Sequence, residues 1–199
     1  MTTPGEERVR SFIAIPVPSA RIEALEETVK RLDSEIGENV RWVRPEGIHL
    51  TLKFLGDIPA GRVEHVLESL PLVTARFSPF ELVISGLGVF PNPERPRVLW
   101  AGITGDLKGL SALQLAVDDA VGKLGVPKEQ RAFFPHLTLG RVRRDVPEVQ
   151  LRKIGQTLAH GELPDGPSWT ADAVNLMRTE LDPAGSRHFL VGAASIGAG

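Results

Sequence analysis

The tetrapeptide His-Leu-Thr-Leu occurs twice in this chain of 199 residues, at 49–52 and again at 136–139. Two of the five histidines in the chain therefore begin an identical motif. Random placement gives roughly 0.04 occurrences of a His-apolar-Thr-apolar pattern at this composition, and two copies on the order of once per thousand such sequences. The repeat therefore needs a cause, and a similar strand is expected in each half of the chain.

Each motif is predicted to lie between two helices. A strand over 10–17 precedes an amphipathic helix over 19–36, for which Ser19 is the expected N-cap and Gly37 occupies the C-cap position. The other expected elements are strands near Trp42 and over 48–55, 80–90, 97–103, 136–142, 172–181 and 188–196, and helices over 59–73, 105–125 and 146–160. The order helix, motif strand, helix thus occurs twice.

The motif histidines are 87 positions apart, which is too long for a small solenoid repeat and suits two similar half-domains. We expect residues 1–199 to form a single bilobal α+β domain with mostly antiparallel sheets. Hydrophobic residues make up 42% of the chain and the net charge is -2, as in ordinary soluble proteins. The chain lacks cysteine and its first residues lack a secretory pattern, so we expect a cytoplasmic protein without disulfides or membrane contact.

Side chains alternate between the two faces of a strand, which separates each motif into an apolar and a polar side. In the first motif His49 and Thr51 should share one face, while Leu50, Leu52 and Phe54 should point into the core. The same alternation places His136 with Thr138 in the second motif. If the half-domains pack with pseudo-symmetry, the two polar faces meet across a groove.

Two imidazoles and two hydroxyls around one groove suit acid–base chemistry at phosphorus. With an ordinary pKa of about 6.5, one histidine can accept a proton from water while the other donates a proton to a leaving oxygen. The hydroxyls of Thr51 and Thr138 can hydrogen-bond the nonbridging phosphate oxygens. Positive charge gathers around both motifs, and between 128 and 144 five basic residues stand against one acidic residue. No step of this chemistry requires a metal or another cofactor.

The chain resembles the two-histidine phosphoesterases, specifically the RNA 2',3'-cyclic phosphodiesterases, also called 2'-5' RNA ligases, of the LigT-like group. The resemblance rests on the paired His-x-Thr-x motifs and on the stretches "VRSFIAIPVP", "RWVRPEGIHLTLKFLGD", "PRVLWAGI" and "FFPHLTLGRV". It implies a bilobal fold around a central cleft, and it implies hydrolysis of a terminal 2',3'-cyclic phosphate to a 2'-phosphate. RNA ends or nucleotides with such a phosphate would be the binding partners, and no obligate protein partner is indicated.

The resemblance also implies roles for individual residues. His136 would be the proton acceptor for water, and His49 would be the proton donor to the 3'-oxygen. Arg141, five positions beyond the second motif histidine, would contact phosphate, although strand alternation places it away from His136 unless the chain bulges near Gly140.

Further substrate contacts are expected just upstream of the second motif. Arg131 is a candidate cation, and Phe134 could stack on a base, whereas at least one of Phe133 and Phe134 is expected in the core. Lys53 is a further candidate cation for phosphate. The C-terminal region lacks the tyrosine that many relatives carry there, so no contact is assigned to it.

Other interpretations remain open at the level of sequence. The same residues could join RNA ends in the reverse, 2'-5' ligase direction, or the chain could be a noncatalytic RNA-binding module. A metal-dependent hydrolase is disfavoured, because neither a His-x-His nor a His-Glu-x-x-His pattern is present. His65, His160 and His188 have no motif around them and are expected to lie outside the site.

Overall fold

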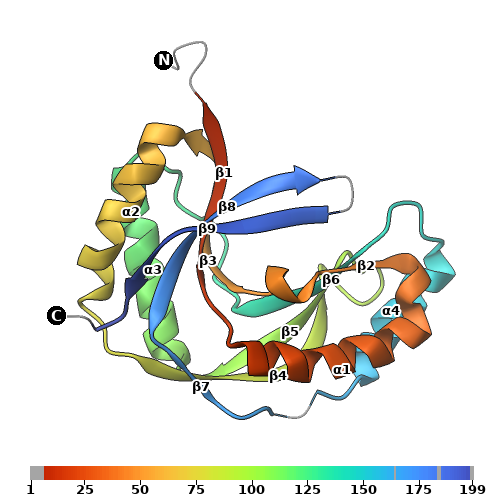
Figure 1. Cartoon of the computed structure of the whole chain (residues 1–199). Helices are drawn as coiled ribbons and strands as arrows, with labels where there is room; N and C mark the ends of the chain where they lie inside the picture. Colours follow the sequence, from red (N-terminus) through yellow and green to blue (C-terminus); the bar gives the residue numbers. More distant parts are fainter. Residues whose placement is uncertain (1–6, 164, 183–184, 198–199) are drawn as a thin grey trace.

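The computed structural model describes residues 7–163, 165–182 and 185–197 (Figure 1). Its strands are β1 (Arg8–Ile15), β2 (Val40–Trp42), β3 (Leu50–Pro59), β4 (Phe80–Phe90), β5 (Val98–Gly105), β6 (His136–Val142), β7 (Trp169–Ala171), β8 (Ala173–Asp182) and β9 (Gly185–Ser195). Its α-helices are α1 (Ser19–Ile36), α2 (Ala60–Thr74), α3 (Leu107–Lys123) and α4 (Glu148–His160). The elements agree with the predicted ones within a few residues, except that β7 was not predicted.

All strands pair antiparallel, in the order β7-β4-β5-β6-β3-β1-β8-β9, and β2 adds to the edge of β6. Within the described residues, β3 and β6 share one Cα pair, Leu50 with Leu137. We call β3, β1, β8 and β9 the β3 half, and β6, β5, β4, β7 and β2 the β6 half. The predicted bilobal α+β architecture with mostly antiparallel strands is confirmed.

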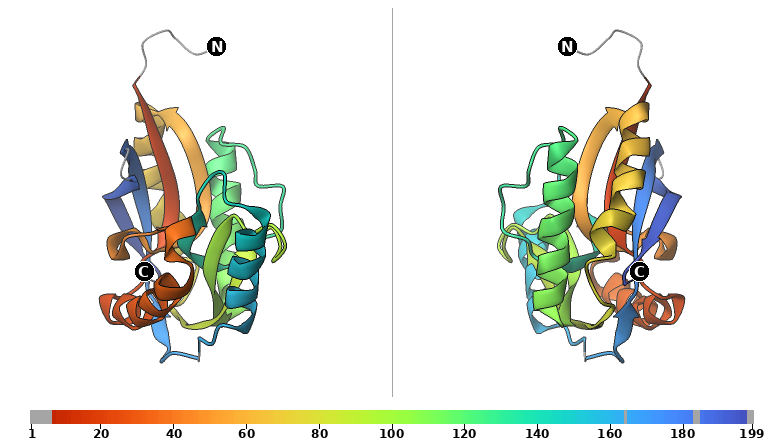
Figure 2. Two further views of the ribbon diagram at one scale, coloured as in Figure 1. Left: turned by 90° about the vertical axis from the view of Figure 1, so that its right-hand side faces the viewer. Right: turned by 90° about the vertical axis from the view of Figure 1, so that its left-hand side faces the viewer.

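The helices cover the sheet in two pairs. Figures 1 and 2 show α2 and α3 together on one flank, where they pack on the main core, and α1 and α4 on the opposite flank. A smaller cluster of buried side chains lies under α1 and α4 and includes Leu32, Leu99 and Ile154. Both helix pairs bury their apolar faces against the sheet. The face of the sheet that neither pair covers is left for polar side chains. No helix within the described ranges is long and apolar enough to cross a membrane.

Three of the four helices begin directly after a proline. Pro18, Pro59 and Pro147 precede α1, α2 and α4 with φ between -57° and -59°, a value that the pyrrolidine ring sets in advance. The expected N-cap at Ser19 is therefore wrong, because Ser19 is already helical and Pro18 occupies the cap position without a side-chain hydrogen bond. Before α3, the carboxylate of Asp106 accepts a hydrogen bond from the Gly109 amide and caps the helix.

Candidate active site

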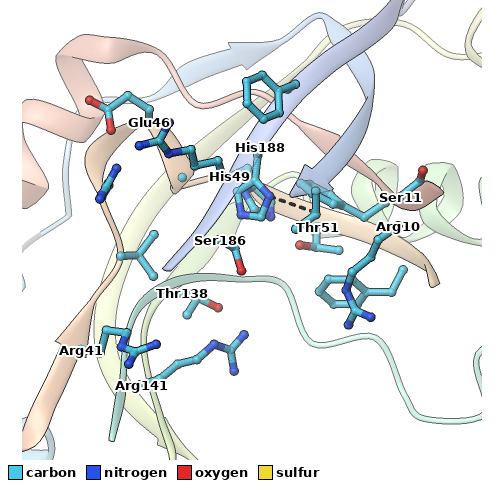
Figure 3. Close-up of a pocket in the computed structure, with 18 of the residues that line it drawn as sticks. Arg10, Ser11, Arg41, Glu46, His49, Thr51, Thr138, Arg141, Ser186 and His188 are labelled. Atoms are coloured by element: carbon cyan, nitrogen blue, oxygen red, sulfur yellow. Dashed lines mark hydrogen bonds between the residues drawn. The ribbon is translucent and has the colours of Figure 1, made fainter. Parts of the chain in front are cut away.

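A pocket of about 540 Å³ opens where the edge of β6 passes from pairing with β3 to pairing with β2 (Figure 3). The segment from 43 to 49, which connects β2 to β3, spans this gap. The pocket is lined by Arg10, Ser11, Phe12, Arg41, Trp42, Val43, Arg44, Glu46, Gly47, His49, Thr51, Phe54, Gly56, Thr138, Arg141, Thr179, Ser186, Arg187, His188 and Phe189. Both halves of the sheet thus contribute to one polar cavity.

The pair Leu50–Leu137 determines how the two motifs face each other. Both leucines are fully buried, so the residues before and after them point to the opposite, open face. Extending the antiparallel register by one residue places His49 across from Thr138 and Thr51 across from His136. His49, Thr51 and Thr138 line the pocket. His136 is half-buried and is not among the lining residues, but it is close enough to His49 that two positive charges would repel.

The ring of His136 is held in one orientation. Its Nδ1 lies 2.7 Å from the carbonyl oxygen of Phe134, and a carbonyl can only accept, so Nδ1 carries the proton. The Nε2 atom of the neutral ring then has a free lone pair. Phe90 contacts the ring edge-on, with the centroids 5.0 Å apart. Burial and, secondarily, the charge of Arg141 lower the pKa of His136. The free site therefore favours the neutral form, which is the form of a proton acceptor.

His49 lies in a similar setting in the other half. Its ring stacks on Phe12 at 4.4 Å and is hydrogen-bonded to the backbone of Gly47, two residues before it. His136 bonds the carbonyl two residues before it in the same way. Burial, together with repulsion from His188 and His136, lowers the pKa of His49 to about 4. With this pKa His49 is neutral at pH 7, so a role as proton donor requires an anion that raises the pKa again.

Each motif strand contains a β-bulge three residues after its histidine. In β3, Lys53 and Thr51 oppose the consecutive residues Ile13 and Ala14, so Leu52 is the additional residue. In β6, Gly140 and Thr138 oppose Leu99 and Trp100, so Leu139 is the additional residue. A bulge reverses the alternation of side chains beyond it. The residues after each bulge therefore face the side opposite to the one predicted.

The two bulges bring Phe54 and Arg141 into the pocket. Both residues stand five positions beyond a motif histidine, and both line the cavity. The expectation that Phe54 points into the core is wrong, since 64% of its surface is exposed. Arg141 reaches the pocket because β6 bulges beside Gly140, where a Cβ atom would come within 2.7 Å of Val40 Cγ1. From the sequence, Arg141 was expected to reach the site only if the chain bulges near Gly140, and the structure has this bulge.

Arginines dominate the charge of the pocket. Arg10, Arg41, Arg44, Arg141 and Arg187 line it, against the single acidic residue Glu46. Arg41 and Arg141 are directly opposite each other on β2 and β6, and Figure 3 shows both beside Thr138. Like charges placed across two strands repel, so the arrangement becomes favourable when an anion lies between them. This part of the pocket is suited to a phosphate group.

His188 was expected outside the site, and this expectation is wrong. It lies on β9 with its ring 5.2 Å from His49 and 5.0 Å from Phe12, and its Nδ1 is 3.0 Å from the hydroxyl of Thr179. Burial lowers the pKa of His188. A signal was available in the sequence, because the strand patterns on either side of "DPAG" predict a hairpin. In the structure β8 and β9 pair Thr179 with His188. Long-range packing of this hairpin beside β1 was not evident from any local pattern.

Four other residues considered from the sequence lie apart from the pocket lining. Arg131 is exposed on the segment before β6, where its amide donates to the Glu129 carboxylate. Phe134 is 51% exposed and packs edge-on against Phe90 and Trp100 next to His136. Phe133 packs against the main core, as expected for one of the two phenylalanines. Lys53 is buried and points away from the cavity.

No group of three or more His, Cys, Asp or Glu side chains among the described residues is arranged to hold a metal ion. The groups that are present are imidazoles, hydroxyls and guanidiniums. Together they can accept a proton, donate a proton and bind the oxygens of a phosphate group.

Comparison with known proteins agrees with this chemistry. The family model described as "LigT like Phosphoesterase" matches residues 15–100 and 104–188. An RNA 2',3'-cyclic phosphodiesterase of Methanothermobacter thermautotrophicus is 33% identical over 181 residues, which cover 89% of this chain and 94% of that protein. An enzyme of the same name from Archaeoglobus fulgidus is 38% identical over 141 residues, covering 71% of this chain and 77% of that protein.

Solved structures show the same fold. A protein of Thermus thermophilus superposes with a TM-score of 0.77 at 26% identity, covering 94% of this chain and 98% of that one. Escherichia coli LigT complexed with 3'-AMP superposes with a TM-score of 0.70 at 23% identity, covering 96% and 99%. The β3 half and the β6 half are therefore arranged as in these proteins.

Proposed function

Because the chain belongs to the LigT-like phosphoesterase family, we propose that it hydrolyses terminal 2',3'-cyclic phosphates of RNA or nucleotides to 2'-phosphates. The relatives described above carry the name of this activity. The single observation that best supports the proposal is the meeting of two identical motifs at the Leu50–Leu137 pair, on the open face of the sheet. We propose that this arrangement gives one histidine to each side of the phosphorus atom of a bound substrate.

The proposed reaction is an in-line displacement by water. Nε2 of His136 takes a proton from the attacking water, whose oxygen forms a bond to phosphorus. The bond between phosphorus and the 3'-oxygen breaks, and His49 donates a proton to that oxygen. The products are a 2'-phosphate and a 3'-hydroxyl. His136 then carries the additional proton and His49 lacks one, and exchange with solvent restores both.

A bound phosphate would allow His49 to act as a proton donor. An anion beside an imidazole favours its charged form and raises its pKa. The pKa of His49 is lowered to about 4 by its protein surroundings, so substrate binding and proton uptake by His49 would be coupled. Solvent protons would be taken up when the substrate binds, and the unliganded site would avoid two neighbouring positive rings.

Thr51, Thr138 and Arg141 are proposed to hold the phosphate. The two hydroxyls line the pocket from different strands, Thr51 from β3 and Thr138 from β6, and can bond different nonbridging oxygens. The guanidinium of Arg141 can bond two oxygens at once. Arg131, which is exposed 10 residues before Arg141, is proposed to contact the RNA chain beyond its terminal nucleotide.

Two exposed phenylalanines flank the motifs and are proposed as stacking surfaces for bases. Phe54 lines the pocket in the β3 half, 6.2 Å from Phe12. Phe134 stands beside His136 in the β6 half. Stacking on an aromatic ring requires no particular base, so this contact would support binding with little sequence preference.

The proposal is tested with purified protein, 2',3'-cyclic AMP and an RNA ending in a 2',3'-cyclic phosphate, in the presence of EDTA. Turnover in EDTA supports a metal-independent hydrolase, and loss of turnover contradicts it. Binding without turnover would identify a noncatalytic RNA-binding module. Addition of an RNA with a 5'-hydroxyl end tests the alternative 2'-5' ligase direction, because joined product would then accumulate.

A further inference from the structure

A buried ion pair connects the first motif strand to helix α3. The ammonium of Lys53, on β3, lies 2.5 Å from the Asp118 carboxylate, and the two side chains are 4% and 9% exposed. Lys53 would share the open face with Thr51 if β3 were regular. The bulge at Leu52 turns it to the other face instead, away from the pocket. Lys53, which the sequence made a candidate for binding phosphate, thus points into the protein.

The same pair also holds the segment that leads into the second motif. Nζ of Lys53 donates to the carbonyl of Pro127 at 2.7 Å, and Oδ1 of Asp118 accepts from the amide of Glu129 at 3.2 Å. This segment continues without helix or strand to His136. Its residue Phe134 provides the carbonyl that fixes the ring of His136. The ion pair therefore contacts β3, α3 and the approach to β6.

These contacts lie where the sheet itself provides little connection. Among the described residues, β3 and β6 pair at Leu50–Leu137, and beyond that pair their backbones separate. One turn before Asp118 on α3, the Gln114 amide donates to the carbonyl of Leu52 at 3.4 Å. Two buried polar side chains of α3 thus bind the stretch of β3 that does not pair with β6. Helix α3 joins the two halves by polar contacts in place of a continuous strand ladder.

We propose that Lys53 and Asp118 are positioning residues, which set the place and orientation of His136 relative to His49. The ion pair acts through the 127–135 segment and through the Phe134 carbonyl, and it does not touch the substrate. The kinetic tests of this inference rest on the proposed function. The tautomer of the His136 ring tests the inference without any measurement of activity. A shift of a reacting group by about 1 Å can reduce a rate roughly 100-fold, so small movements of this segment would be measurable.

The test separates positioning from stability by removing the pair in two steps. Lys53→Met leaves the Asp118 carboxylate buried and unpaired, and Tm is expected to fall by roughly 10 °C. The double variant Lys53→Met/Asp118→Leu replaces both charges by apolar groups and should regain most of that loss. With 2',3'-cyclic AMP, its kcat is expected to stay roughly 10- to 100-fold below the wild-type value, while KM changes about twofold or less.

A neighbouring pair provides the matched control. Lys128 and Asp119 join the same segment to the same helix at 2.5 Å, but their side chains are 65% and 61% exposed. Lys128→Met/Asp119→Leu should keep wild-type Tm and kcat, because exposed pairs contribute little. A kcat loss as large in this control as in the buried double variant would contradict the proposal.

Long-range ¹H–¹⁵N NMR of the His136 ring gives the readout that does not depend on activity. We expect one Nδ1–H tautomer in the wild-type protein and a mixture in Lys53→Met/Asp118→Leu. A folded double variant with wild-type kcat and a wild-type ring spectrum would overturn the inference. If wild-type protein failed to hydrolyse cyclic phosphates, the proposed function would fail, and the ring spectrum alone would decide this inference.

A second variant decides the question if the double variant does not fold. Glu129→Pro removes the amide that donates to Asp118, and it also removes the carboxylate that accepts from the Gln130 and Arg131 amides. Glu129→Ala removes that carboxylate alone and is the control, and both variants keep Lys53 and Asp118. Lowered kcat and an altered His136 ring spectrum at near wild-type Tm would support positioning. Unchanged kcat and an unchanged spectrum would show that this anchor does not position His136.

Discussion

Leu50 and Leu137 are antiparallel partners at the point where β3 meets β6, and both are completely buried. Each leucine is the second residue of a motif, so this one pair places two histidines and two threonines on the opposite face. Chemistry at the pocket therefore depends on an apolar contact that no substrate touches.

The two motif histidines should be needed for turnover. His49→Ala and His136→Ala are each expected to lower kcat/KM for 2',3'-cyclic AMP by about 100-fold or more, the usual scale for loss of a general acid or base. Thr51→Ala and Thr138→Ala should lower it roughly 2- to 10-fold, because each removes one neutral hydrogen bond. His65→Ala, on α2 and outside the pocket lining, is the control. Near-normal turnover in either motif variant would remove that histidine from the mechanism.

The pH dependence of kcat/KM should be bell-shaped and shifted to acid. One ring must be neutral and the other charged, and the limbs belong to the coupled pair. In the free enzyme the pKa of His49 is lowered from 6.5 to about 4 and that of His136 is lowered below 6.5, so both limbs should lie below pH 6.5.

The profile of kcat should lie at higher pH, because bound phosphate raises the pKa of the donor. Both profiles are measured with the same cyclic nucleotide in one buffer series of constant ionic strength. A rate that rises steadily with pH, without an alkaline limb, would indicate attack by hydroxide and no acid histidine.

Arg141→Ala should weaken phosphate binding while the fold is retained. We expect kcat/KM to fall by roughly 10-fold or more, since a charge-assisted hydrogen bond contributes about 1.5–3 kcal/mol. Arg141→Lys should recover only part of the loss, because an ammonium lacks the planar fork of a guanidinium. Kinetics and thermal melting are compared with Arg143→Ala, which lies outside the pocket lining. Early melting with normal turnover would show that Arg141 is structural.

Base stacking can be assigned by comparing two phenylalanines. Phe54→Ala and Phe134→Ala are each expected to raise KM for a cyclic nucleotide by roughly 5- to 100-fold, the range for loss of one stacked base. Ribose 2',3'-cyclic phosphate, which has no base, is the control substrate, and its KM should not change. An equal effect on both substrates would mean that the ring supports the site and does not stack on the base.

Acid should destabilise the protein through His49. A histidine with a lowered pKa binds its proton less readily in the folded state, so stability is lost as the pH falls from 6.5 toward 4. The expected loss from this one group is roughly 2 kcal/mol between pH 7 and pH 5. Urea unfolding at the two pH values should show a smaller loss in His49→Asn, and an identical loss in both proteins would contradict the lowered pKa.

The sequence was sufficient to predict the elements that carry the motifs. Alternation along each strand correctly placed Leu50 and Leu137 in the core, because a strand with one buried face leaves little freedom of register. The relation of His49 to His136 followed from the repeat, since equivalent strands in two halves tend to pack alike.

What the sequence could not predict lies beyond the bulges. A bulge depends on the pairing of a strand with its neighbours. Gly140 indicated that β6 could bulge beside Leu139, but nothing local marks the bulge at Leu52. For that reason Phe54 was placed in the core, and Lys53 was considered for phosphate. His188 was missed because β9 reaches the pocket through the packing of a hairpin from the end of the chain.

The most direct measurement of the central claim is ³¹P NMR of the product formed from 2',3'-cyclic AMP in H₂¹⁸O, with EDTA present. Attack of water on phosphorus with departure of the 3'-oxygen predicts 2'-AMP with one ¹⁸O on its phosphate, formed at a rate that falls about 100-fold or more in His136→Ala. Formation of 3'-AMP, incorporation of ¹⁸O into the ribose, or loss of wild-type turnover in EDTA would contradict the account.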